Sequence, residues 1–224
     1  KRIELNSALH LGGLTPSLAS LKMTKANTNL TVICMVRPRG AGFCYSKSEY
    51  RQMLIEAKDL LETGADGLAF GFLHENHEID VERTRKMVEL CKKYHKTAVF
   101  HRAFDCVNDP YKSIEILIDL GVDRLLTSDL KAKAMYGIEL IKELQAKYGD
   151  KIEILAGSGV NASNAKEIVE IAKINQIHSS CKDWRTDPTT SGKDVNYCYG
   201  PETHQNDYDV VSLDLVKKLV KLGL

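Results

Sequence analysis

The sequence of 224 residues has no excess of charge of either sign and no long apolar run. Its 31 Lys and Arg residues and 30 Asp and Glu residues give a net charge of +1, so no global field would attract nucleic acid or an acidic membrane. It lacks the run of about 18 apolar residues that a transmembrane helix needs, and its first residues lack a signal-peptide core. We therefore expect a soluble cytoplasmic protein that binds neither nucleic acid nor membranes.

The six cysteines include no CxxC pair and no closely spaced framework of the secreted type. Reduced thiols are therefore the expected state. Cys34 and Cys91 lie in apolar stretches, where a free cysteine usually packs as a small hydrophobic residue. The other four, nearer to predicted loops, remain open to a chemical role: Cys44, Cys106, Cys181 and Cys198.

Short apolar segments alternate with segments of helical periodicity along the whole chain. Seven strands are predicted, over residues 3–7, 31–36, 67–73, 98–100, 124–128, 152–156 and 176–180. Predicted helices cover 16–25, 47–61, 80–94, 110–120, 134–148 and 213–222, with one more after 160. Thr15, Ser46 with Glu49, and Asn161 or Ser163 are the expected caps of three of them. Units of about 30 residues are typical of βαβ crossovers and predict one parallel-sheet domain over residues 1–224.

Two α/β architectures fit this pattern, a TIM (β/α)8-type barrel and an open doubly wound sheet. A barrel places polar residues at the end of every strand, whereas an open sheet concentrates them at one switch point. Nearly every predicted strand here ends in a polar group, which favours the barrel. Seven strand–helix units can be recognised, one fewer than the eight of a closed TIM barrel. We therefore expect that a first strand and helix precede Lys1; a seven-stranded or open barrel is the alternative. Residues 182–209 are predicted to form a long loop that serves as a lid or oligomer contact.

The segment after the predicted strand 98–100 carries His101, Arg102 and Asp105. Carboxyl ends of strands are where α/β proteins bind ligands and do chemistry. His101 is a candidate general acid or base, and Arg102 and Asp105 could orient it or bind substrate. Because adjacent strand residues point to opposite faces, His101 and Arg102 cannot both face the barrel axis unless the strand has already ended, and we expect His101 to be the one that does.

Two arginines follow the second predicted strand, Arg37 and Arg39. A guanidinium presents a planar fork of donors suited to carboxylate or phosphate, and the two would share a face if the strand continued through Pro38. Glu4 stands among apolar neighbours, where a carboxylate is costly to bury unless it is paired. It could be a catalytic carboxylate or could neutralise one of the arginines.

Further anion-binding candidates follow the later strands. The turn containing Ser158 and Gly159 could present backbone N–H groups to an anion, and barrel phosphate sites commonly use the loops after the last two strands. His178 and Ser179 follow the last predicted strand, and Ser128 ends the strand 124–128. The glycines also satisfy the geometry of a tight turn, so their presence alone is a weak signal.

Taken together, several motifs resemble the copper homeostasis protein CutC family. They are Arg2-Ile3-Glu4-Leu5, the segment 12–17, Arg37-Pro-Arg-Gly40 with Phe43, the segment 100–105, Leu126-Thr-Ser128 and His178-Ser-Ser180. The resemblance implies a TIM-barrel fold, a cytoplasmic location, homo-oligomers such as dimers or tetramers, and a role in copper tolerance or trafficking with Cu(I) binding. It also implies that one more strand and helix precede the Arg2–Leu5 motif.

The sequence departs from this family at Asn6, where family members often have cysteine. If Cu(I) binds, the resemblance leaves Cys44, Cys106 and Cys181 as replacement thiols. The polar residues at the strand ends are retained, which favours a second hypothesis. In that hypothesis the protein is an enzyme acting on a small phosphorylated or carboxylated metabolite, which Arg37 and Arg39 bind while His101 and Glu4 transfer protons. The expected ligand is therefore a copper ion or a small anion.

Overall fold

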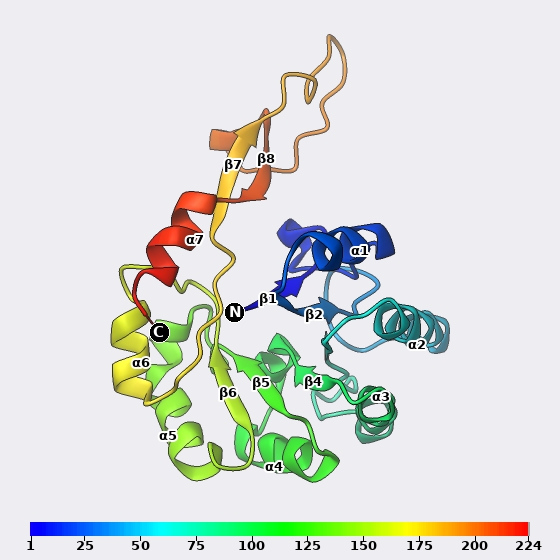
Figure 1. Ribbon diagram of the computed structural model, residues 1–224, viewed down its shortest axis with the longest axis vertical. Coiled ribbons are helices and arrows are strands. Elements are labelled where there is room, and N and C mark those ends of the chain that lie inside the picture. Colours follow the sequence, from blue (N-terminus) through cyan, green and yellow to red (C-terminus); the bar gives the residue numbers. More distant parts are fainter. Residues whose placement is uncertain (224) are drawn as a thin grey trace.

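The centre of the protein is a curled sheet of six parallel strands (Figure 1). The structure, a computed structural model, describes residues 1–223. Each strand pairs with the next one in sequence. The strands are β1 (Arg2–Leu5), β2 (Thr31–Met35), β3 (Gly67–Phe70), β4 (Thr97–Phe100), β5 (Arg124–Thr127) and β6 (Glu153–Ala156). This order is that of a (β/α) barrel, and it confirms the predicted fold class.

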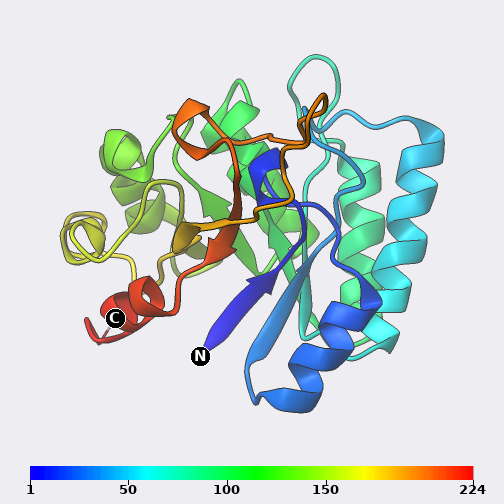
Figure 2. The ribbon, with the colours of Figure 1, turned by 90° about the horizontal axis from the view of Figure 1, so that it is seen from above.

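Five helices connect these strands, a sixth follows β6, and all lie outside the curl of the sheet (Figures 1 and 2). They are α1 (Leu18–Asn27), α2 (Lys47–Glu62), α3 (Val81–Lys93), α4 (Pro110–Leu120), α5 (Ile138–Tyr148) and α6 (Ala165–Ala172). The predicted capping box of α2 is confirmed, since the Ser46 hydroxyl accepts from the Glu49 N–H and the Glu49 carboxylate accepts from the Ser46 N–H. Among residues 1–223, every helix is too short or too polar to span a bilayer.

The period of two along each strand divides the apolar residues into two clusters. Outward-facing residues such as Leu68, Phe70 and Phe100 pack beneath the helices in the larger cluster. Ile33, Met35, Ala69 and Val99 form a small cluster of their own. Each has the opposite parity to the outward-facing residues, so this cluster fills the interior of the curl. Just past the ends of β2 and β4, residues of this same inward-facing parity are polar and line the site.

Two predicted helix caps are wrong. Helix α1 is capped by Ser17, whose hydroxyl accepts from the Ser20 N–H, because Thr15 instead bonds the backbone of Arg37 and the Glu56 carboxylate. Helix α6 begins after Asn164, whose side chain turns back to accept from the Asn161 N–H. A 3-10 turn, Ala134–Gly137, precedes α5 where a continuous helix was predicted.

The predicted seventh strand, residues 176–180, is also wrong. This segment runs beside β6, but a single bridge between Ala156 and Ile177 is its only strand pairing among the described residues (Figure 1). Ile177 is its one strongly apolar side chain, which is too little to cover two faces of a buried strand. The Gln176 side chain contacts β1 and β5 instead: its Oε1 accepts from Arg2 at 2.6 Å and from Arg124 at 3.0 Å.

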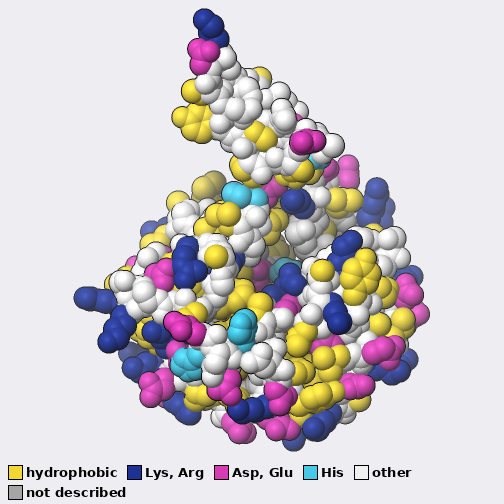
Figure 3. Space-filling model, turned by 180° about the vertical axis from the view of Figure 1, so that it is seen from behind, with side chains coloured by type: hydrophobic (Ala, Val, Ile, Leu, Met, Phe, Trp, Pro, Cys, Tyr) yellow, Lys and Arg dark blue, Asp and Glu magenta, His cyan; other side chains and the backbone are white. Residues whose placement is uncertain are grey.

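The predicted long loop at 182–209 is largely a β-hairpin. Strand β7 (Lys182–Thr186) pairs antiparallel with β8 (Asp207–Val211), and helix α7 (Leu213–Val220) follows. The hairpin and residues 187–206 form an arm that projects from the barrel, and the barrel is hollowed beneath it (Figures 1 and 3). The arm carries several exposed aromatic residues, of which Tyr197 is 82% exposed. Sequence reasoning missed the hairpin because its strands, unlike β2 to β6, are mostly exposed and polar.

Candidate functional site

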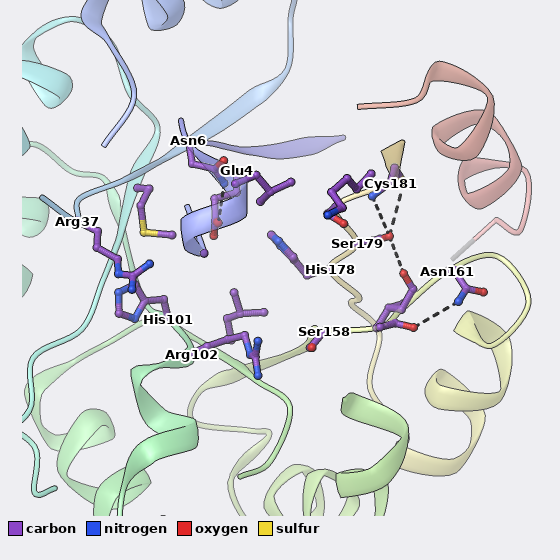
Figure 4. Close-up of a pocket in the computed structure, with 18 of the residues that line it drawn as sticks. Glu4, Asn6, Arg37, His101, Arg102, Ser158, Asn161, His178, Ser179 and Cys181 are labelled. Atoms are coloured by element: carbon purple, nitrogen blue, oxygen red, sulfur yellow. Dashed lines mark hydrogen bonds between the residues drawn. The ribbon is translucent and has the colours of Figure 1, made fainter. Parts of the chain in front are cut away.

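A cavity of about 460 Å³ opens at the carboxyl ends of the barrel strands (Figure 4). It brings together most of the residues predicted to form the site: Glu4, Arg37, His101, Arg102, Ser158, Gly159, His178, Ser179 and Cys181. Five predicted residues do not line it: Arg39, Asp105, Ser128, Cys44 and Cys106. Five segments distant in sequence therefore converge on one space, as expected for a barrel site.

Arg37 lies two residues beyond the end of β2 and keeps the inward parity of Met35. Its side chain is buried, with Nη1 donating to the carbonyls of Leu11 and Gly13 and Nη2 donating to that of Ala41. Its Nε is buried without a hydrogen-bond partner among residues 1–223. All of its hydrogen-bond acceptors in this part of the chain are neutral carbonyls, so the guanidinium is held rigidly while its charge stays uncompensated.

His101 immediately follows β4 and, as predicted, faces the cavity. Its ring is 3% exposed, and Nδ1 accepts from the Ala103 N–H at 3.2 Å. Burial, together with the nearby charges of Arg37 and Arg102, lowers the pKa of His101 to about 3. His101 is therefore a neutral imidazole near pH 7. Its Nε2 has no partner within the described part of the chain.

Arg102 also lines the cavity, so the expectation that only one of these neighbours would face it is wrong. Strand β4 ends at Phe100, and a 3-10 turn, Arg102–Cys106, replaces the strand alternation. Arg102 Nε donates to Asp105 at 2.7 Å and Nη2 donates to the Ser128 hydroxyl at 2.8 Å. Part of the guanidinium remains exposed towards the cavity.

Asp105 is a structural anchor in this arrangement rather than a wall of the cavity. Its carboxylate accepts from Arg102, from the Thr127 hydroxyl at 2.6 Å and from the Ser128 N–H at 3.0 Å. The Ser128 hydroxyl and the Leu130 N–H lie near the same oxygens. We call Asp105, Arg102, Thr127 and Ser128 the Asp105 cluster. It ties the 3-10 turn after β4 to the end of β5, so Asp105 and Ser128 act on the cavity only through Arg102.

The Arg39 side chain makes its hydrogen bonds outside the cavity. Its Nε donates to Glu49, the residue of the α2 capping box, and its other nitrogens donate to the carbonyls of Gly40, Gly42 and Cys44. The predicted shared face with Arg37 required the strand to continue through Pro38, but β2 ends at Met35. Arg39 therefore fixes the loop before α2, and the two arginines do not form a pair.

Glu4 reaches the cavity from β1. Its carboxylate has one weak contact, from Asn6 Nδ2 at 3.5 Å, and it makes no ion pair with Arg37. A lining carboxylate with so few contacts is available to a ligand or to a proton. The strand period could have identified two lining residues that sequence reasoning missed, because Asn6 and Met35 have the same parity as Glu4 and Arg37.

Ser158, Gly159, His178 and Ser179 also line the cavity, and Ser158, His178 and Ser179 lie across it from Arg37 (Figure 4). The Ser158 hydroxyl donates to the Ala132 carbonyl at 2.7 Å, and the Ser179 hydroxyl donates to the Val160 carbonyl at 2.6 Å. These hydroxyls have therefore used their protons within the protein. They offer an anion less than the sequence suggested, although Lys182, next to Cys181, also lines the cavity and could supply a charged donor.

The thiols predicted as copper ligands are dispersed. Cys44 and Cys106 are exposed and lie outside the cavity, whereas Cys181 lines it beside Ser179. No group of three or more His, Cys, Asp or Glu side chains among residues 1–223 is arranged to hold a metal ion. The predicted set of Cys44, Cys106 and Cys181 is therefore not one site. Cys34 and Cys91 are buried, as predicted.

Comparison with known proteins identifies relatives of the whole chain. The model of the CutC family matches residues 1–183. A CutC family protein of Treponema denticola is 43% identical over 222 residues, which cover 98% of this chain and 89% of the relative. The crystal structure of a copper homeostasis protein CutC from Streptococcus agalactiae superimposes with a TM-score of 0.75 at 32% identity, covering 80% of this chain and 87% of the other.

A deoxyribose phosphate aldolase from Aeropyrum pernix shares the fold alone, with a TM-score of 0.57 at 16% identity over 73% of this chain and 69% of the other. The match of the family model and the identity with the Treponema protein over nearly the whole chain agree with the motifs at the strand ends. This chain belongs to the CutC family of copper homeostasis proteins.

Proposed function

We propose that the cavity binds a small anionic metabolite through Arg37 and that the protein is an enzyme acting on it. The observation that carries this proposal is the buried guanidinium of Arg37, whose acceptors among residues 1–223 are neutral carbonyls. A buried charge without a counter-charge costs several kcal/mol. A carboxylate or phosphate in the cavity would remove that cost and accept from the free Arg37 Nε.

The chemistry of an enzyme here would come from Glu4 and His101. Glu4 is a carboxylate with one weak contact, and His101 is an imidazole that lacks a partner at Nε2 within the described residues. Both line the same cavity as Arg37, so a bound metabolite would touch a cation, a proton acceptor and a neutral donor. This agrees with the second hypothesis from the sequence, with Arg37 alone in the role given to two arginines.

The test is calorimetric titration of the protein with inorganic phosphate and with pyruvate. We expect at least one of them to bind, and Arg37→Met to weaken that binding at least about 10-fold because the charge-assisted bonds are lost. Arg51→Met, a change at an exposed arginine outside the cavity, is the matched control and should bind like the wild type. Equal affinity in Arg37→Met and the wild type would overturn the proposal.

Copper handling is the second candidate, favoured by the family and by Cys181. The thiol of Cys181 and the imidazole of His178 line one cavity, and thiolate and imidazole are both copper ligands. Titration of reduced protein with Cu(I) against a competing chelator tests this role. We expect Cys181→Ser to lose the site, while Cys44→Ser and Cys106→Ser keep it because these thiols lie elsewhere. Tight binding that survives Cys181→Ser contradicts this assignment.

We also propose that the protein works in the cytoplasm as a homo-oligomer, with the arm as a subunit contact rather than a lid. Support comes from the exposed aromatic residues of the arm, such as Tyr197 and Tyr199. Light scattering during gel filtration should give a dimer or tetramer, and Tyr197→Ser should shift it towards the monomer. If the mass of this variant is the same as that of the wild type, the arm is not a subunit contact, and the alternative role as a lid is favoured.

A further inference from the structure

We propose that the reaction in this cavity is removal of a proton from a carbon next to a carbonyl group, with Glu4 as the base and His101 as a neutral hydrogen-bond donor to the carbonyl oxygen. The substrate class is a small anion that carries a ketone or aldehyde, such as a 2-oxo acid or a phosphorylated hydroxyketone. This inference rests on the anion site proposed above and names the chemistry performed there.

The hydrogen bond at Nδ1 fixes the role of His101. A ring nitrogen that accepts from a backbone N–H carries no proton, so the neutral imidazole holds its proton on Nε2. Nε2 is buried and unpartnered in the part of the chain that the structure describes. A buried N–H without an acceptor is costly, and a substrate oxygen would remove that cost. His101 is therefore arranged to donate and not to take up a proton.

A second unpartnered donor comes from the end of a different strand. Arg37 Nε and His101 Nε2 are both buried nitrogens without partners among residues 1–223. Phe43 packs against both side chains, 5.2 Å from Arg37 Cζ and 5.0 Å from the centre of the His101 ring. Such donors, held in place before the reaction, stabilise the negative charge that develops on oxygen when a carbonyl becomes an enolate.

Glu4 supplies the acceptor that this chemistry needs. It lines the cavity from β1, across the interior of the barrel from His101, and its carboxylate is not tied into an ion pair (Figure 4). Asp105, the other carboxylate singled out from the sequence, is unsuitable because its oxygens already accept several hydrogen bonds. A base on one side and a neutral imidazole donor on the other form a known arrangement for proton abstraction next to a carbonyl.

The step balances without any further reactant. A Glu4 carboxylate oxygen takes the proton, the electron pair of the C–H bond becomes the carbon–carbon π bond of the enolate, and the carbonyl π pair moves onto oxygen. His101 Nε2–H donates to that oxyanion, while the Arg37 guanidinium holds the anionic group of the substrate and its positive charge favours the developing negative charge. If the proton on Glu4 exchanges with solvent before it returns to the same carbon, the carbon-bound hydrogen is exchanged. Its return to the neighbouring carbon of a hydroxyketone, with transfer of the substrate's own hydroxyl proton to the oxyanion, gives an isomer. Nothing is oxidised or reduced overall.

The experiment follows exchange of carbon-bound hydrogen by NMR in D2O, with pyruvate and dihydroxyacetone phosphate as probes. We expect the wild type to exchange at least one of them far faster than buffer does. Glu4→Gln should lower the rate at least about 100-fold while the probe still binds, because the base is lost and the anion site is kept. Glu75→Gln, at an exposed carboxylate outside the cavity, should exchange like the wild type.

The outcomes separate the two proposals. Binding of a probe that depends on Arg37, without exchange above buffer, overturns the proton abstraction and leaves the anion site standing. Failure of both probes to bind removes the anion site and this inference with it. A second measurement is independent of turnover: ¹⁵N NMR of His101 should show a protonated Nε2 and a bare Nδ1 from about pH 5 to 8. A His101 that titrates near its ordinary pKa of 6.5 overturns its assigned role.

Discussion

Two polar groups at neighbouring strand ends differ in how far their hydrogen-bonding capacity is used. In the Asp105 cluster, one carboxylate accepts from Arg102, Thr127 and Ser128. The Arg37–His101 pair, at the ends of β2 and β4, keeps two buried nitrogens without partners among residues 1–223. Both groups follow buried apolar strands, and from the sequence they look alike.

The difference separates the framework of the site from its ligand-binding surface. A carboxylate that already accepts several bonds gains little from a ligand and contributes mainly to the stability of the native state. Donors that are buried without acceptors reduce stability and contribute to binding, because a ligand supplies the missing partner. Asp105 therefore mainly stabilises the fold, whereas Arg37 and His101 mainly serve ligand binding.

Replacing Asp105 by alanine is the most severe test of this division. The change leaves the Thr127 hydroxyl and the Ser128 N–H without their acceptor, so we expect a loss of about 3–5 kcal/mol in the free energy of unfolding. Urea denaturation measures it. Asp109→Ala, which removes only the N-cap of α4, should cost about 1 kcal/mol. Equal effects of the two variants would mean that the cluster is not the framework.

Asp129, next to the cluster, behaves in the opposite way to Asp105. It is 1% exposed, and both of its oxygens lack partners in the described chain. Burial raises the pKa of Asp129 to about 7, and the charge of Asp105 contributes. Between its ordinary value of 3.8 and about 7 the folded state alone holds the proton, so this residue makes stability fall as pH rises. Asp129→Asn should therefore gain up to about 4 kcal/mol over wild type near pH 8 and little near pH 4.

His101 changes the stability of the protein with pH in the opposite direction to Asp129. Because its pKa falls from 6.5 to about 3 on folding, the unfolded state alone is protonated between these values, and stability is lost as pH falls through that range. His101→Gln should remove this loss, worth at most about 4 kcal/mol near pH 3. In the wild type, the contributions of Asp129 and His101 to the pH dependence of stability have opposite signs between about pH 4 and 6.5. Across this range, the urea midpoint should rise more steeply with pH for Asp129→Asn than for the wild type, and less steeply for His101→Gln.

The sequence predicted the parts of the fold that depend on apolar periodicity. Strands β1 to β6, their helices and the capping box of α2 all follow from local patterns, as does the inward direction of His101. The prediction of a strand at 176–180 was wrong and the hairpin strands β7 and β8 were missed, because these mainly polar segments carry no such pattern. Their conformation depends on tertiary contacts such as those of Gln176 with Arg2 and Arg124.

The sequence predicted which strand ends form the site, but it did not predict the role of each side chain there. Arg37 and Arg39 have the same chemistry and lie two residues apart, yet Arg37 lines the cavity and Arg39 binds the α2 capping box. What decides between them is the path of the chain after β2 ends at Met35, which turns Arg39 towards Glu49 and which no local pattern predicts. Asp129 carried no signal either, because its burial results from the packing of the loop after β5.

Arg102 belongs to both groups, and its replacement gives the smallest expected effect. It donates to Asp105 and to Ser128, but its side chain is 41% exposed, so solvent screens the ion pair. Arg102→Gln should cost about 1 kcal/mol or less in the free energy of unfolding. Phosphate or pyruvate affinity should fall only about 3-fold or less, because Arg37 remains. Calorimetry and urea denaturation of this variant test both statements. A loss of affinity as large as that of Arg37→Met would place Arg102 with the ligand-binding surface and not with the framework.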